Sequence, residues 1–211
     1  LLVEGTEDEK VVFTSLRDDT YAGNTNNDTT GVQPDRSNWG GIDINGQPTD
    51  SSRINNLIVR YASDGLLLSD TDVVVDSSIF SFNTNGVIVQ SNAEPTFRHS
   101  DFHNNFTGMY VRFSNAKPLI QLSNFYSNRD NAIYQGSGTD IMAENNYWGD
   151  PSGPFVNNGP DQNVNGQGDR INVVSGTVDY RPYLVGRNGI LLGDVTINGT
   201  ISAFDASKIL L

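Results

Sequence analysis

The chain reads Val75-Asp76-Ser77-Ser78-Ile79-Phe80, and similar six-residue blocks precede and follow this stretch. The other blocks span residues 54–59, 97–102, 120–125 and 142–147. All five end at positions 59, 80, 102, 125 and 147, so the steps between them are 21, 22, 23 and 22 residues. A repeat this short cannot bury its apolar face alone and must stack on neighbouring copies. The spacing therefore predicts a solenoid.

Each repeat also contains a second apolar run. These runs are Gly65-Leu66-Leu67-Leu68, Gly86-Val87-Ile88-Val89, Gly108-Met109-Tyr110-Val111 and Ala132-Ile133-Tyr134. Short β-branched and aromatic runs separated by Asn and Gly are typical of strands. Two or three such strands in ~22 residues make one coil of a parallel β-helix. The sequence thus predicts an all-β fold.

Stacking would place equivalent residues of successive coils in columns about 4.8 Å apart. The predicted inward columns are Ile54, Val75, Phe97, Ile120 and Met142, and Val59, Phe80, Phe102, Phe125 and Tyr147. A polar turn column, whose side chains satisfy backbone groups, contains Ser78, Ser100, Ser123 and Asn145. A solvent-facing column contains Asn55, Asp76, Arg98, Gln121 and Ala143. It predicts an exposed ion pair between Asp76 and Arg98.

The ends of the chain depart from the repeat. Strands of earlier coils are expected at 11–15 and 39–44, on either side of an acidic insertion loop at 16–38. At the other end, the Gly- and Pro-rich segment 146–154 stops the pattern. We therefore predict a β-helix over residues 1–184 with a closing cap at 155–184, a linker at 185–192, and a separate segment at 193–211.

The segment Trp39-Gly40-Gly41-Ile42, the Asn- and Ser-rich coils and the closing Asn146-Tyr147-Trp148-Gly149-Asp150-Pro151-Ser152-Gly153-Pro154 carry a family resemblance. They resemble the right-handed parallel β-helix repeat proteins of bacterial and archaeal surfaces, which share a pectate-lyase-like architecture. The resemblance implies the fold more than an activity. That family includes polysaccharide lyases and hydrolases, but also adhesins and scaffold or surface-layer modules without catalysis.

The composition narrows the function classes. The chain has 13 Lys and Arg against 25 Asp and Glu, a net charge of -12. Such a surface argues against nucleic acid and anionic membranes as partners. It suits a secreted or cell-surface protein in a calcium-rich medium. The chain has no cysteine, which excludes a disulfide framework and thiolate chemistry.

A calcium-loop pattern stands near the C-terminus. Oxygen-bearing groups occupy loop positions 1, 3, 5, 7, 9 and 12, at Asp194, Thr196, Asn198, the carbonyl of Thr200, Ser202 and Asp205. Gly199 stands at position 6, where such a loop turns sharply. Hard oxygen ligands at this spacing are what Ca²⁺ requires. The residues that follow Asp205 are expected to start a helix.

Residues 193–211 resemble the first half of a dockerin, an EF-hand-like module that binds cohesin domains. The resemblance implies Ca²⁺ as the cofactor and a cohesin-like domain as a partner. An Asp at position 12, as in Asp205, is normal in that family. Thr196 departs from the Asn or Asp that is more usual at that position in the family.

Two further polar clusters are weaker calcium candidates. The first lies in the insertion loop and contains Asp18, Asp19, Asn24, Asn26 and Asp28, where oxygen ligands partly alternate. The second contains Asp161, Asn163, Asn165 and Asp169. Each is also readable as a solvated polar loop without metal.

No catalytic residue is predicted. A β-helix lyase or hydrolase needs a carboxylate cluster or pair on one exposed face, and no carboxylate column runs through the central coils. The best patch contains Arg98, His99, Asp101 and His103, with Arg112 and Asp76 nearby. The sequence therefore favours a non-catalytic spacer or binding surface, with a possible polysaccharide ligand. The alternatives are a polysaccharide lyase or glycoside hydrolase docked into a multi-enzyme complex, and a self-assembling surface-layer or filament subunit.

Overall fold

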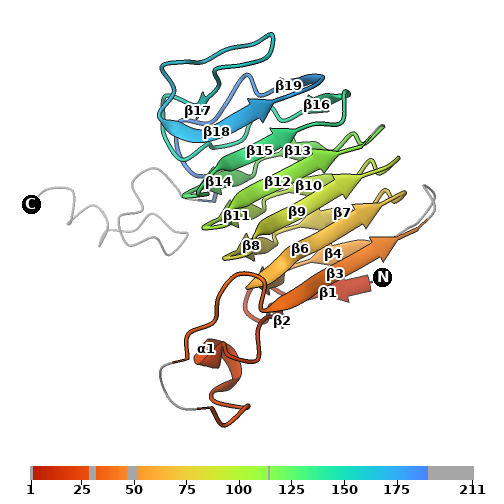
Figure 1. The fold of residues 1–211 in the computed structure, drawn as a ribbon, viewed down its shortest axis with the longest axis vertical. Coiled ribbons are helices and arrows are strands. Elements are labelled where there is room, and N and C mark those ends of the chain that lie inside the picture. The colour runs from red at the N-terminus through yellow and green to blue at the C-terminus, as the bar shows by residue number, and fades with distance from the viewer. Residues whose placement is uncertain (1, 29–31, 47–51, 114, 190–211) are drawn as a thin grey trace, which may run out of the picture.

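The computed structural model describes residues 2–28, 32–46, 52–113 and 115–189, which form a parallel β-solenoid (Figure 1). Three parallel sheets, which we name A, B and C, run along the stack. From the N-terminus to β15, the chain visits A, B and C in turn, once per coil. The predicted all-β solenoid is confirmed.

The strands are short, as the repeat length requires. Sheet A contains β1 (Leu2–Glu4), β4 (Arg53–Asn55), β7 (Val74–Asp76), β10 (Thr96–Arg98), β13 (Leu119–Gln121), β16 (Asp140–Met142) and β19 (Thr177–Asp179). Sheet B contains β2 (Val11–Phe13), β5 (Leu57–Arg60), β8 (Ile79–Ser81), β11 (Asp101–His103) and β14 (Asn124–Tyr126). Sheet C contains β3 (Trp39–Asn45), β6 (Ala62–Ser69), β9 (Asn85–Gln90), β12 (Thr107–Arg112), β15 (Asn131–Gln135), β18 (Gly168–Val173) and β17 (Pro154–Phe155).

The core is a set of side-chain columns inside the coils. Phe80, Phe102 and Phe125 are fully buried and stack in order, with ring centroids 5.4 and 4.5 Å apart. Ile54, Val75, Phe97 and Ile120 form a second fully buried column in register across sheet A. Both inward columns are confirmed for these coils.

The last block is displaced by one residue from the predicted alignment. Met142, predicted to point inward, is 54% exposed, and Ala143, predicted to face solvent, is fully buried in its place. Both predictions are therefore wrong. Tyr147 is likewise only half-buried, and the buried ring of Trp148 stacks on Phe125 at 5.0 Å. Asn146 replaces Asn145 in the polar column, with its Oδ1 accepting from the Ser123 N–H at 2.8 Å. The final step is therefore 23 residues, because the larger Trp148 ring completes the aromatic stack.

The corner between sheets A and B explains the polar column. Asn56, Ser77, His99, Leu122 and Asn145 all have φ between 48° and 58°, the left-handed conformation that turns the chain from one sheet to the next. The serines that follow Ser77 and His99 are buried and bond to backbone groups of adjacent coils.

A buried amide ladder holds the corner between sheets B and C. Asn83 Oδ1 accepts from the Ala62 N–H, and Asn105 Oδ1 accepts from the Asn83 N–H, at 2.8 and 2.9 Å. Asn128 Oδ1 continues the series by accepting from the Asn105 N–H at 3.1 Å. Asp169 then ends it, since its Oδ2 accepts from both the N–H and the Nδ2 of Asn128 at 2.8 Å.

We predict that Asp169→Asn stabilises the solenoid at neutral pH by about 1 kcal/mol. Burial raises the pKa of the Asp169 carboxyl by more than the hydrogen bonds from Asn128 lower it, so the net shift of the pKa is upward. A raised folded-state pKa favours the protonated form, so the contribution of Asp169 is complete below the unfolded-state pKa near 3.8 and is lost as pH rises through the folded-state value. An amide avoids that loss and adds a donor, as Asn105 and Asn128 supply in the coils before.

Denaturant unfolding of parent and variant between pH 3 and pH 7 measures this effect. The advantage of Asp169→Asn should shrink as the pH falls and the parent carboxyl becomes protonated. An advantage that is equal at both pH values would show that the charge of Asp169 is not the cause.

The insertion loop folds back onto the solenoid. It contains the four-residue helix α1 (Asp19–Ala22), which Asp18 caps. The Arg60 guanidinium lies 3.4 Å from the Asp18 carboxylate and over the rings of Tyr21 and Tyr61, at 5.4 and 4.9 Å from the centroids. A buried charge pair and ring contacts thus fasten the start of the loop. None of the described helices has the length and apolar character of a bilayer span.

The two ends of the stack differ. At the N-terminal end, Val3, Phe13, Ile42, Ile44 and Leu57 border a hollow of about 510 Å³ beside the edge strands. At the other end, the buried side chains of Trp148 and Tyr180 lie under non-repeating segments. Tyr183 fastens this region by donating from its hydroxyl to the Ser152 carbonyl at 3.0 Å.

Candidate functional site

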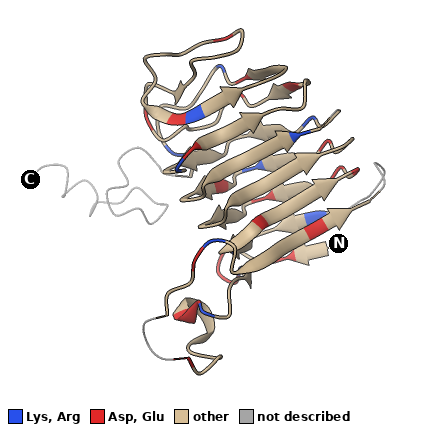
Figure 2. Ribbon diagram, viewed as in Figure 1, with Lys and Arg blue, Asp and Glu red and all other residues tan. Residues whose placement is uncertain are grey.

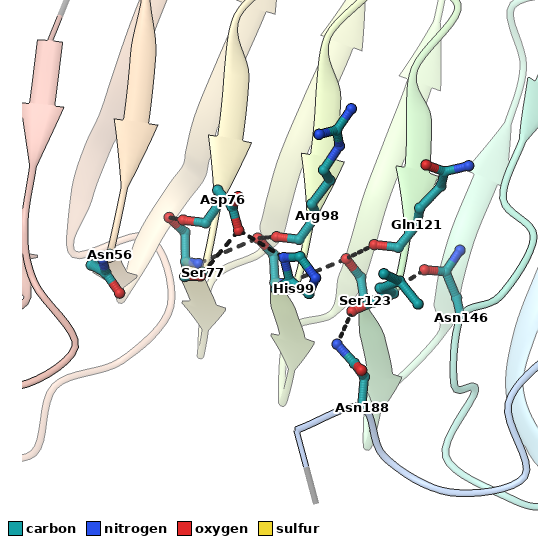
Figure 3. A network of polar contacts seen from close by, with 12 residues as sticks. Asn56, Asp76, Ser77, Arg98, His99, Gln121, Ser123, Asn146 and Asn188 are labelled. Carbon is teal, nitrogen blue, oxygen red and sulfur yellow. Dashed lines mark hydrogen bonds and ion pairs between the residues drawn. The ribbon is translucent and has the colours of Figure 1, made fainter.

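A polar groove of about 650 Å³ follows the corner between sheets A and B and the outer side of sheet B. Successive coils contribute Asn56, Ser77 and His99 from the corner, as Figure 3 shows in part. Ile79, Asp101 and Asn124 line it from β8, β11 and β14. Segments outside the repeat border it with Glu7 and Lys10, and with Asn188 and Gly189.

The strand pattern explains why these side chains face outward. In β8, β11 and β14 the central phenylalanine points into the core, so the residue before it lies on the outer face of the sheet, where Asn188 covers Asn124. Parallel register then aligns Ile79, Asp101 and Asn124 on adjacent rungs. The groove therefore offers one different side chain per rung.

At the corner, Asp76 pairs with an imidazole and not with the predicted guanidinium. Register does place Arg98 beside Asp76, but the Asp76 carboxylate lies 3.0 Å from His99 Nδ1 and accepts from the Ser77 hydroxyl at 3.0 Å. The Arg98 side chain points away from Asp76 (Figure 3). The predicted Asp76–Arg98 ion pair is therefore wrong, because register fixes neighbours on a rung without fixing their side-chain rotamers.

Asp101 is held by groups on both sides. Its Oδ1 accepts from Asn124 Nδ2 at 2.7 Å, and its Oδ2 accepts from Arg187 at 3.0 Å. The same Arg187 nitrogen donates to the Tyr126 hydroxyl at 2.9 Å. Burial, reinforced by the Asp101 charge, raises the pKa of Tyr126 to about 12. The phenol thus stays protonated at neutral pH.

The comparison with protein families agrees with this architecture. A family model described as a right-handed β-helix region matches residues 40–199. The chain belongs to the right-handed β-helix family. No curated protein matches the chain. No solved structure matches it either.

The β-helix separates the predicted polar patch into two parts. His99 and Asp101 line the groove. His103 lies beyond Asp101 and stacks on Tyr126, with ring centroids 4.8 Å apart, and burial lowers its pKa. Arg112 belongs to sheet C, where its Nε donates to Gln90 Oε1 at 2.9 Å.

In the β-helix, several oxygen groups of the insertion loop, those of Asp18, Asn26 and Asp28, accept hydrogen bonds from within the protein. Asp18 accepts from the Thr14 hydroxyl at 2.6 Å. Burial raises the pKa of the Asp18 carboxyl, but the hydrogen bonds from Thr14 and Thr20 and the Arg60 charge together lower it by more, so the net shift of the pKa is downward. Asn24 and Asn26 both donate to Asp28. Among the described residues, no group of three or more His, Asp or Glu is arranged to hold a metal ion.

The other calcium candidates differ in what the β-helix structure shows of them. Asp161 pairs with Arg181 at 2.8 Å, Asn163 donates to the Pro154 carbonyl, and Asp169 belongs to the amide ladder. The stronger candidate, with Asp194, Thr196, Asn198, Thr200, Ser202 and Asp205, lies outside the described residues.

Sequence reasoning missed the residues that border the groove at its ends. Glu7 and Lys10 lie between β1 and β2, and Asn188 lies in the predicted linker, next to the Arg187 that bonds to Asp101. None of them belongs to a repeat, so column alignment contains no signal for their position. The Lys10 ammonium donates to Asn56 Oδ1 at 3.1 Å, which joins this segment to the corner column.

Proposed function

We propose that this β-helix is a non-catalytic interaction module of a secreted or cell-surface protein, and that its groove binds a hydroxyl-rich ligand such as a polysaccharide chain. The observation that carries the proposal is the mixture of amide, hydroxyl, imidazole and carboxylate groups at the spacing of the rungs. Such groups can both donate to and accept from sugar hydroxyls. The bordering charges are of both signs, with Glu7 and Asp101 against Lys10.

The bonding of Asp101, which lines the groove, and of Asp76 beside it supports binding more than catalysis. Glycoside hydrolysis uses two carboxyl groups in distinct protonation states. Here Asp76 is bound by His99 and Ser77, and Asp101 by Asn124 and Arg187. Acids held in this way serve as fixed acceptors. The acidic residues are also spread over strands and loops along the stack (Figure 2).

Calorimetric titration with neutral and uronic acid hexasaccharides tests the proposal. We expect binding without product formation, and about a tenfold loss of affinity in Asn56→Ala/Ser77→Ala, which removes two groups that face the groove. Arg112→Ala, on sheet C, is the matched control. Cleaved or unsaturated products would favour the enzyme alternative, and absence of binding by every glycan would contradict a polysaccharide site.

We also propose that residues 194–205 bind Ca²⁺ and that the tail docks onto a cohesin-like domain. The support is the ligand spacing in the sequence. In calorimetric titration with Ca²⁺, the heat of binding should vanish in Asp194→Ala/Asp205→Ala. Removal of Ca²⁺ with a chelator should leave glycan binding and the melting temperature of the β-helix unchanged. Chelation that melts the whole chain in one step would contradict this arrangement.

A further inference from the structure

The geometry points to the outer face of sheet B as a docking surface for the start of the chain's own C-terminal segment, with residues 185–189 acting as a clasp that fixes where that segment leaves the solenoid. A sequence of this kind between two modules is ordinarily a free linker. In this chain, Arg187 and Asn188 of this segment hydrogen-bond to side chains of β11 and β14.

Arg187 supplies the charged half of the clasp. Its guanidinium donates to the Asp101 carboxylate at 3.0 Å and to the Tyr126 hydroxyl at 2.9 Å, and it lies 4.2 Å from the Tyr126 ring centroid. The Arg187 side chain is 35% exposed and that of Asp101 is 21% exposed. The pair is thus partly removed from water, where a hydrogen bond between charged groups is stronger than on an open surface.

Asn188 supplies the second half by a different chemistry. Its backbone N–H donates to Asn124 Oδ1 at 2.7 Å, and its carbonyl accepts from Asn124 Nδ2 at 3.1 Å. Its own side-chain amide donates to the Leu122 carbonyl (Figure 3). The side-chain amide of Asn124 therefore bonds to both backbone polar groups of Asn188.

The docking position is specified by sequence and not by the repeat alone. The same outward-facing position of sheet B is Asp101 on β11 and Asn124 on β14. On β5 and β8 it is Ile58 and Ile79. Aliphatic side chains offer neither a carboxylate for Arg187 nor an amide for Asn188. The clasp therefore fits only the rungs of β11 and β14, and it borders one end of the groove through Asn188 and Gly189.

Tryptic cleavage after Arg187 in the full chain tests the clasp. A protease must pull the Arg187 side chain from its partners, so the cleavage rate follows the population of the open segment. We expect Asp101→Ala and Asn124→Ala each to raise the rate of this cleavage about tenfold. Asp76→Ala is the matched control, since it removes a carboxylate at the end of β7 in sheet A, which bonds to His99 and not to the clasp.

A synthetic peptide of residues 181–193 supplies the rate for an unclasped segment. Parent cleavage well below the peptide rate, with acceleration in the two clasp variants only, would support the docking surface. Parent cleavage at the peptide rate, or equal rates in all variants, would overturn it. Far-UV circular dichroism and melting identify any variant that unfolds. In that event, hydrogen exchange at the Asn188 amide in Arg187→Gln replaces the cleavage assay, with faster exchange supporting the clasp and unchanged exchange overturning it.

Discussion

Replacing Asn105 with alanine is expected to lower the free energy of unfolding by about 4 kcal/mol. The Asn105 side chain is fully buried, accepts from the N–H and Nδ2 of Asn83, and donates to the Phe80 carbonyl. Alanine would leave the Asn83 N–H and the Phe80 carbonyl without this partner inside the protein. Denaturant unfolding followed by circular dichroism measures the loss.

The control for this variant lies in a second amide ladder on the surface. Asn92 donates to Asp70 Oδ1 at 2.6 Å and accepts from Asn115 at 3.0 Å, but it is exposed. Water can replace both partners, so Asn92→Ala should cost less than about 0.5 kcal/mol. Equal losses in the two variants would mean that burial is not what makes the inner ladder strong.

Phe102→Ala is expected to cost about 4 kcal/mol in unfolding free energy. The ring is fully buried, stacks between Phe80 and Phe125, and meets the edge of Phe97 at 5.7 Å. Its removal leaves a cavity in the middle of a column that the flanking coils cannot close without moving. Thermal and denaturant unfolding give the magnitude.

Two further variants separate cavity formation from loss of the aromatic ring. Phe102→Leu keeps most of the volume and should cost about 1.5 kcal/mol. Phe113→Ala removes a ring that is 61% exposed, and its cost should stay near zero. A loss in Phe113→Ala as large as that in Phe102→Ala would contradict the assignment of the phenylalanine column as the core.

The regular coils were predictable because each turn of the solenoid imposes the same burial pattern. Val75 and Phe80 have counterparts at a nearly constant spacing, and the structure buries those counterparts. The alignment failed at the closing block because Met142 and Tyr147 are apolar enough to imitate core residues. The burial of Ala143, the Asn146–Ser123 hydrogen bond and the stacking of Trp148 on Phe125 reveal the extra residue in that coil.

The polar sites were less predictable, because they depend on contacts between segments of unrelated sequence. His99 and Asp101 were found as part of one polar patch, since both fall in the repeat block 97–102. Asp169 reaches Asn128 across 41 positions of non-repeating chain, and Arg187 reaches Asp101 across 86. The repeat period contains no signal for such pairs. The role of Asp169 in the amide ladder is recognisable only once the structure shows the ladder.

The coil geometry also has a mechanical consequence. Each coil adds only about 4.8 Å to the height of the stack, whereas its roughly 22 residues span about 75 Å when fully extended. Tension that peels a coil from its neighbour must break the ladder bonds of that coil and then releases a long slack of chain. Under load, the solenoid would lengthen in discrete steps and absorb work at each one, as a shock absorber does between two anchored points.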